Sequence, residues 1–121
     1  RLVGRGVDLE LRDGEAAVPA AQLRKSCDQL VATTAAIGEL GDPARMMANA
    51  TVYLEAAGHV VVAWQWLDQF IATLGHDGDF YDGKRQAARY FFAFELPKTG
   101  PQFDLLAAGD DTTLEMRPEW F

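Results

Sequence analysis

The chain is poor in the residue types that build disulfides and metal sites. It has one cysteine, Cys27, and two histidines, His59 and His76. A single cysteine excludes an internal disulfide, and a protein without disulfides is most simply expected in the cytoplasm. Residues 1–15 contain no apolar segment of the kind that a signal peptide needs. We therefore expect a cytoplasmic protein.

Positive charge is also scarce. Eleven Lys and Arg residues stand against 18 Asp and Glu residues, which gives a formal net charge of −7. Surfaces that bind nucleic acids carry a basic patch, and anionic membranes attract clustered cations. After Phe103 the chain has five carboxylates against Arg117 alone. The composition argues against a nucleic-acid partner and disfavours an anionic membrane surface.

No apolar run is long enough to cross a bilayer. The longest uncharged run covers residues 56–67, twelve residues, whereas a membrane span needs about 20. Residues 43–74 nevertheless contain only three charged side chains, Arg45, Glu55 and Asp68. This pattern predicts one long helix, with a bend possible at Gly58, that is apolar around most of its circumference. Such a helix is covered by other helices or by a partner.

The remaining patterns predict three further helices. The first begins near Pro19 and ends at Gly41, with Asp42 and Pro43 restarting the chain as N-cap and first-turn proline. Its inward face follows helical steps: Leu23, Cys27, Leu30, Val31, Thr34 and Ile37. A third helix covers about 80–96 and is broken by Pro97. A short fourth helix follows Gly100 and ends at Gly109.

Strand signals are nearly absent, so the predicted fold class is all-α. The short connections favour an antiparallel up-and-down bundle of three long helices and one short helix. Residues 1–15 are expected to form a lead-in from a preceding domain. Residues 16–121 are expected to form the bundle domain, with an acidic tail over 110–121.

No constellation of residues predicts a catalytic, cofactor-binding or metal site. Glu55 and His59 share a helix face at i, i+4, but a catalytic zinc needs three protein ligands. The segment 76–83 has the spacing of a calcium loop only in part, and capping by Asp77 or Asp79 is the preferred interpretation. Cys27 has no neighbouring base, and we expect it to be a small buried residue. The glycines form neither a dinucleotide-binding nor a P-loop motif.

Two groups of residues are candidates for an interface instead. Trp64, Trp66 and Phe70 lie on the long apolar helix, where a small bundle has difficulty hiding every side chain. Lys84, Arg85 and Arg89 cluster on the third helix. This basic cluster can dock on acidic groups of a neighbouring domain or subunit, meet a phosphate, or be solvated.

Two stretches of the sequence, 49–67 and 80–98, carry a family resemblance. The residues concerned are Asn49-Ala50, Gly58-His59-Val60, the run from Lys84 to Tyr90, and Leu96-Pro97. Over about 15–121 the chain resembles the extra C-terminal helical domain of a subgroup of acyl-CoA dehydrogenases. This subgroup acts on long or unusual acyl-CoAs, including methylthiopropanoyl-CoA.

The resemblance implies an accessory role without chemistry of its own. In such enzymes FAD, the acyl-CoA pocket and the catalytic glutamate belong to the preceding domains, and none of these sites maps onto the present residues. The expected partners are the catalytic domains of the same polypeptide and identical subunits. A free-standing helical dimerisation protein is the alternative from the residues alone. Reading the gene upstream of Arg1 distinguishes the two.

Overall fold

The computed structural model describes residues 14–121, and these residues form helices joined by short turns. The α-helices are α2 (Ala17–Gly38), α3 (Pro43–Met47), α4 (Ala50–Thr73), α5 (Asp79–Tyr90), α6 (Thr99–Ala108) and α7 (Thr112–Glu115). A π-helix, η1 (Phe91–Glu95), and two 3₁₀ turns, η2 (Leu96–Lys98) and η3 (Pro118–Trp120), complete the set. Residues 14–121 contain no strand, so the all-α prediction is confirmed. The predicted lead-in, 1–15, lies almost entirely outside the described range.

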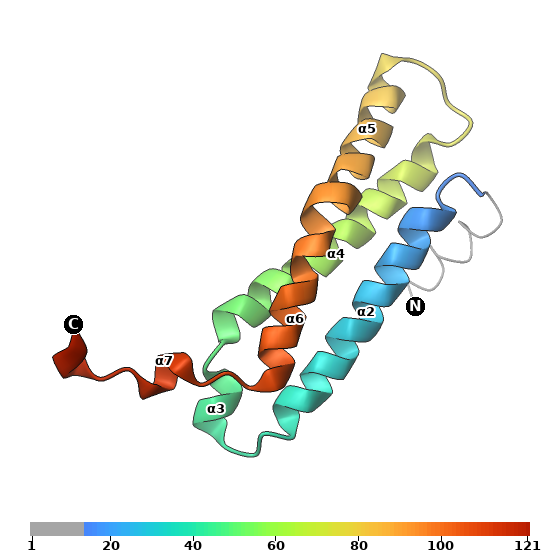
Figure 1. Cartoon of the computed structure of the whole chain (residues 1–121). Helices are drawn as coiled ribbons and strands as arrows, with labels where there is room; N and C mark the ends of the chain where they lie inside the picture. The colour runs from blue at the N-terminus through green and yellow to red at the C-terminus, as the bar shows by residue number, and fades with distance from the viewer. Residues whose placement is uncertain (1–13) are drawn as a thin grey trace.

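Three rods lie side by side in Figure 1. The first rod is α2, the second is α4, and the third runs without a turn from α5 through η1 and η2 into α6. The chain reverses at α3 and again in the loop between α4 and α5. Within the third rod, α5 packs against α4, whereas α6 packs against both α2 and α4. The second rod therefore contacts both of the others.

The core consists of one apolar face from each rod. The α4 face repeats at steps of three and four residues, as an inward helix face must: Ala56, Val60, Ala63, Leu67 and Phe70. Opposite it lie the buried Leu23 of α2 and Phe92, Leu96, Phe103 and Leu106 of the third rod. The prediction for Val31 was wrong, because its side chain is 70% exposed. Eight helical steps place Val31 about 80° around α2 from Leu23, outside the buried face.

The predicted long helix over 43–74 is interrupted near its start. Asp42 caps α3 as predicted and accepts a hydrogen bond from the Ala44 amide at 3.3 Å. However, α3 ends at Met47, and α4 begins only at Ala50 and then continues through Gly58. The interruption places two side chains at the end of α6. Asn49 Nδ2 donates to the Asp110 carbonyl at 2.8 Å, and Arg45 Nη2 donates to the Gly109 carbonyl at 3.2 Å.

Pro97 does not end the third rod. In a regular α-helix its ring would clash with the carbonyl four residues earlier, and it has no N–H to donate. The chain passes this position by widening into the π-helix η1 and then tightening into the 3₁₀ turn η2. The helical path therefore continues to Gly109, which adopts φ 65° and ends α6 as predicted.

Two glycines, one that ends α6 and one inside α4, are expected to respond to substitution in opposite directions. Gly109→Ala forces a side chain into the left-handed region, 2.7 Å from Leu40 Cδ2. We expect a loss of about 1–3 kcal/mol in the free energy of unfolding. Gly58 lies inside α4, and a Cβ there meets nothing within 4 Å. Gly58→Ala is therefore expected to gain about 0.5–1 kcal/mol. Urea denaturation of both variants measures the pair, and equal effects would contradict the assigned backbone conformations.

Candidate functional site

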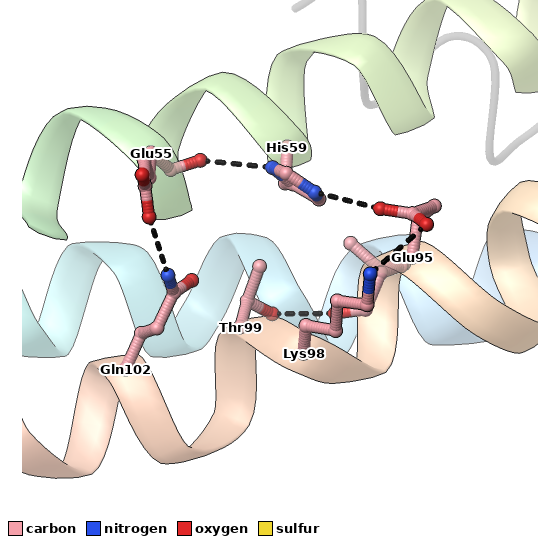
Figure 2. Close-up of polar contacts among 7 residues, drawn as sticks. Glu55, His59, Glu95, Lys98, Thr99 and Gln102 are labelled. Atoms are coloured by element: carbon pink, nitrogen blue, oxygen red, sulfur yellow. Dashed lines mark hydrogen bonds and ion pairs between the residues drawn. The ribbon is translucent and has the colours of Figure 1, made fainter.

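The densest group of polar side chains lies where α4 faces η1 and η2. Figure 2 shows His59 of α4 directed at Glu95, the last residue of the π-helix. His59 Nε2 lies 3.2 Å from Glu95 Oε1, and Lys98 Nζ donates to Glu95 Oε2 at 3.1 Å. The carboxylate of Glu95 is thus held between an imidazole and an ammonium group. This group, His59, Glu95 and Lys98, is called the Glu95 cluster below.

Both ring nitrogens of His59 face hydrogen-bond acceptors. Nδ1 lies 3.1 Å from the Glu55 backbone carbonyl, one helical turn earlier, while Nε2 faces Glu95. The carbonyl and an ionised carboxylate can only accept, so a ring nitrogen that carries a proton donates to its partner. The side chain of Glu55 turns away and accepts from Gln102 Nε2 at 3.1 Å (Figure 2). Glu55 and His59, which share a face of α4, thus each make a side-chain contact to the third rod.

The electrostatics of the cluster favour an ionised Glu95. The hydrogen bond from Lys98, followed by that from His59, lowers the pKa of Glu95 below its ordinary value. The side chain remains 26% exposed, and the Lys98 side chain is 62% exposed. A partly solvated carboxylate with a lowered pKa is a poor general base. The arrangement joins α4 to the third rod and does not create a reactive group.

The predicted tryptophans and Phe70 are placed differently from one another. Phe70 is 3% exposed and belongs to the core. Trp66 is half-buried, with Lys84 Nζ 5.8 Å from its ring centroid. Trp64 is also half-buried, and its indole Nε1 is buried without an acceptor among residues 14–121. Trp64 and Trp66 therefore remain available as interface residues, whereas Phe70 is occupied inside the bundle.

The predicted basic cluster points in three directions. Lys84 lies over the rings of Trp66 and Phe80 and reaches Gln69 of α4. The guanidinium of Arg89 lies 5.5 Å from the Phe70 ring. Five helical steps separate these two cations by about 140° around the helix. A single patch of three cations is therefore not formed.

Arg85 is the third of these cations, and it acts within the domain. It donates to the Thr73 carbonyl at 2.7 Å and to the His76 carbonyl at 3.0 Å, and it pairs with Asp82 at 2.8 Å. Its side chain is only 14% exposed. Arg85 thus satisfies the Thr73 carbonyl at the end of α4 and the His76 carbonyl in the loop that follows.

The loop before α5 and Cys27 show no constellation for chemistry. The N-cap of α5 is Gly78, so the prediction that Asp77 or Asp79 caps the helix was wrong; Asp79 instead lies in the first turn. Burial raises the pKa of the half-buried Cys27 thiol, and the Asp28 carboxylate raises it further. Among residues 14–121, no group of three or more His, Cys, Asp or Glu side chains could hold a metal ion. No helix in this range is long and apolar enough to cross a membrane.

A groove of about 350 Å³ lies between the start of α2, α4 and the third rod. Val18, Phe70 and Phe92 contribute to its apolar lining, and Arg89 is the cation that lines it. The groove has no glycine-rich helix N-terminus that could cradle a phosphate.

Comparison with known proteins gives the family. The model of the family described as acetyl-CoA dehydrogenase C-terminal like matches residues 6–117. The chain belongs to this family. The match confirms the family part of the resemblance, and the C-terminal position in its description is consistent with a domain of a larger protein. The comparisons with curated proteins and with solved structures gave no match.

In this family member, sequence reasoning missed most of the residues that join the rods. Glu95 and Gln102 lie 36 and 47 positions from their partners on α4, His59 and Glu55. Lys98 contacts Glu95, three positions earlier, and directly follows Pro97, where the regular helical pattern breaks. Asn49 and Arg45 contact residues more than 60 positions away. Charged and polar residues at helical spacing usually indicate a solvated face, so no local signal marked them.

The Glu95 cluster predicts a specific dependence of stability on pH. Because the folded state lowers the pKa of Glu95, its stabilising contribution is complete above the ordinary glutamate value, about 4.3. It is lost as the pH falls through the lowered pKa. We expect Glu95→Gln to lower Tm at pH 5.5, and the difference from the wild-type Tm to shrink as the pH falls below the ordinary pKa of glutamate. Thermal unfolding followed by circular dichroism measures this, with Glu119→Gln, an exposed tail carboxylate, as control. A Tm difference independent of pH would show that the carboxylate charge has no role.

Proposed function

We propose that this chain is the C-terminal accessory domain of an FAD-dependent acyl-CoA dehydrogenase. The parent enzyme belongs to the subgroup that acts on long or unusual acyl-CoAs. The domain packs on the catalytic domains of the same polypeptide and contributes to the association of subunits. FAD and the catalytic glutamate belong to the preceding domains. The observation that carries the proposal is the family match, which covers residues 6–117 of the 121-residue chain.

The surface of the third rod supports a packing role. Phe80 is 68% exposed, Tyr90 54% and Phe94 61%. Lys84 lies over the rings of Phe80 and the half-buried Trp66, and Tyr90 stacks on Phe94 farther along the rod. Together these five residues are called the aromatic face below. Aromatic residues are enriched in protein interfaces, and large apolar patches are rarely left exposed to water. The Tyr90 and Phe94 rings stack on each other, with centroids 4.7 Å apart.

The polar groups of the domain support a role without chemistry. The side chains of the Glu95 cluster contact one another between α4 and the third rod. Arg85 donates hydrogen bonds to the Thr73 carbonyl at the end of α4. Burial raises the pKa of Cys27, which keeps its thiol protonated at neutral pH. The bundle is therefore suited to presenting surfaces to its neighbours.

The parent enzyme provides the test. Phe94→Ser on the aromatic face is expected to loosen the domain without unfolding it, because the residue is exposed. Proteolytic release of the domain from the full-length enzyme should then accelerate severalfold, while bound FAD remains in the catalytic part. Val31→Ser, at a 70% exposed position on α2, is the matched control. Equal release rates for the two variants would contradict packing through the aromatic face.

A second candidate function, a free-standing dimerisation protein, is favoured by the outer face of α4. Leu54 is 70% exposed and Val61 52% exposed on this helix. The reading frame upstream of Arg1 separates the two functions. A dehydrogenase core encoded in the same frame supports the accessory domain, and a start codon directly before Arg1 overturns it.

A further inference from the structure

An apolar hollow lies at the end of the bundle where α2 ends and α4 begins. Its volume is about 330 Å³, and α2, α3, α4 and α6 all contribute to its lining. It is called the methionine hollow below, and its apolar lining consists of Ile37, Met46, Met47, Ala50, Leu54 and Leu106. Because a cavity of about 150 Å³ already holds a benzene ring, the methionine hollow has room for a large apolar side chain.

The polar side chains that line the methionine hollow are already engaged in hydrogen bonds. Thr34 Oγ1 donates to the Leu30 carbonyl at 2.8 Å and lies 2.8 Å from the Tyr53 hydroxyl. Asn49 Nδ2 donates to the Asp110 carbonyl at 2.8 Å. The surface that the hollow offers is therefore mainly apolar, and it suits an apolar occupant.

Two apolar side chains of the lining are largely exposed. Met47 of α3 is 67% exposed and Leu54 of α4 is 70% exposed, while Met46 beside them is half-buried. Methionine side chains are flexible and polarizable, so they adapt to the shape of a partner. Grooves of this kind commonly receive the apolar face of an amphipathic helix.

The surroundings of the methionine hollow are acidic. The segments that meet here, 30–55 and 103–111, contain one cation, Arg45, which donates to the Gly109 carbonyl at 3.2 Å. The same segments contain six carboxylates: Glu39, Asp42, Glu55, Asp104, Asp110 and Asp111. Electrostatic complementarity therefore favours a partner that carries positive charge.

The helix ends strengthen this preference. A helix C-terminus carries partial negative charge and is stabilised by a nearby cation. Of the termini of α2, α4 and α6 at this end of the bundle, two are C-termini, and neither has a basic residue in its last turn. Glu39, the C-cap residue of α2, places a negative charge where a positive charge is favoured. A lysine or arginine of a partner would supply that positive charge.

We infer that the methionine hollow is the docking site for an amphipathic basic helix of another protein. A large apolar side chain of that helix enters the hollow between Met47 and Leu54, and its basic side chains face Glu39 and Asp111. The start of the described chain lies at the other end of α2, about 33 Å along this 22-residue helix (Figure 1). The preceding domains join the bundle there, so the occupant is assigned to a separate protein. The inference goes beyond the proposed function and does not rest on it.

A synthetic peptide tests the apolar part of the site. The probe is an amphipathic helix of about 14 residues, made of leucine and lysine with one tryptophan in its apolar face. Isothermal titration calorimetry with the 121-residue chain should show one saturable site. Met47→Ser with Leu54→Ser should weaken binding at least about tenfold, since apolar anchors in pockets dominate interface energies. Val18→Ser with Phe80→Ser changes two equally exposed positions at the other end of the bundle and should leave the affinity unchanged.

Two charge variants test the acidic part of the site. Glu39→Lys with Asp111→Lys and Asp77→Lys with Asp79→Lys alter the net charge equally, but only the first pair lies beside the methionine hollow. We expect the first pair to weaken binding at least about tenfold and the second pair to weaken it much less. Equal weakening would show that the peptide follows the net charge of the chain, which overturns the inference.

The exposed C-terminal aromatics provide a further control. Trp120→Ala with Phe121→Ala should leave peptide binding unchanged, and circular dichroism verifies the helical content of every variant. Absence of a saturable site, or binding that is lost in this tail variant and kept in the hollow variant, overturns the inference. Sedimentation equilibrium of the free chain examines the remaining occupant. A dimer that Met47→Ser with Leu54→Ser dissociates would assign the hollow to a second copy and overturn the separate partner.

Discussion

The inward face of α4 is the constraint on which the rest of the bundle depends. Its buried residues repeat at helical spacing over 56–70, and the helix packs against α2, α5 and α6. Burial of such a face supplies roughly 25 cal/mol per Å² of apolar area. Small residues at Ala56 and Ala63 let neighbouring helices approach closely, while Leu67 and Phe70 fill the space beside them. The positions of the other rods follow from this packing.

The third rod keeps its contacts with α4 because it accommodates Pro97 without turning away. A proline inside a regular helix would break or kink it. The π-helix before Pro97 and the 3₁₀ turn that contains it absorb the missing hydrogen bond and the bulk of the ring. The same local change places Glu95 opposite His59, with Lys98 one turn later. The irregular segment thus also connects the third rod to α4 through the contact of Glu95 with His59.

The bundle buries the apolar residues of its core and leaves several aromatic side chains exposed. Phe80, Tyr90 and Phe94 of the third rod are exposed, as are Trp120 and Phe121 of the tail after Gly109. Exposed aromatic residues are typical of protein interfaces. These surfaces agree with a family that is described by its C-terminal position in a larger protein.

The sequence by itself determined the all-α class, the N-cap at Asp42, the helix end at Gly109 and the family. These features depend on local properties: apolar spacing, proline and glycine conformations, and short motifs. Sequence reasoning did not find the break at 48–49, the continuation of the helix through Pro97, or the partner of His59. It also treated Lys84, Arg85 and Arg89 as one patch. Only the tertiary structure decided these points, because each depends on which side chain from a distant segment meets the position, and helical spacing alone does not encode that.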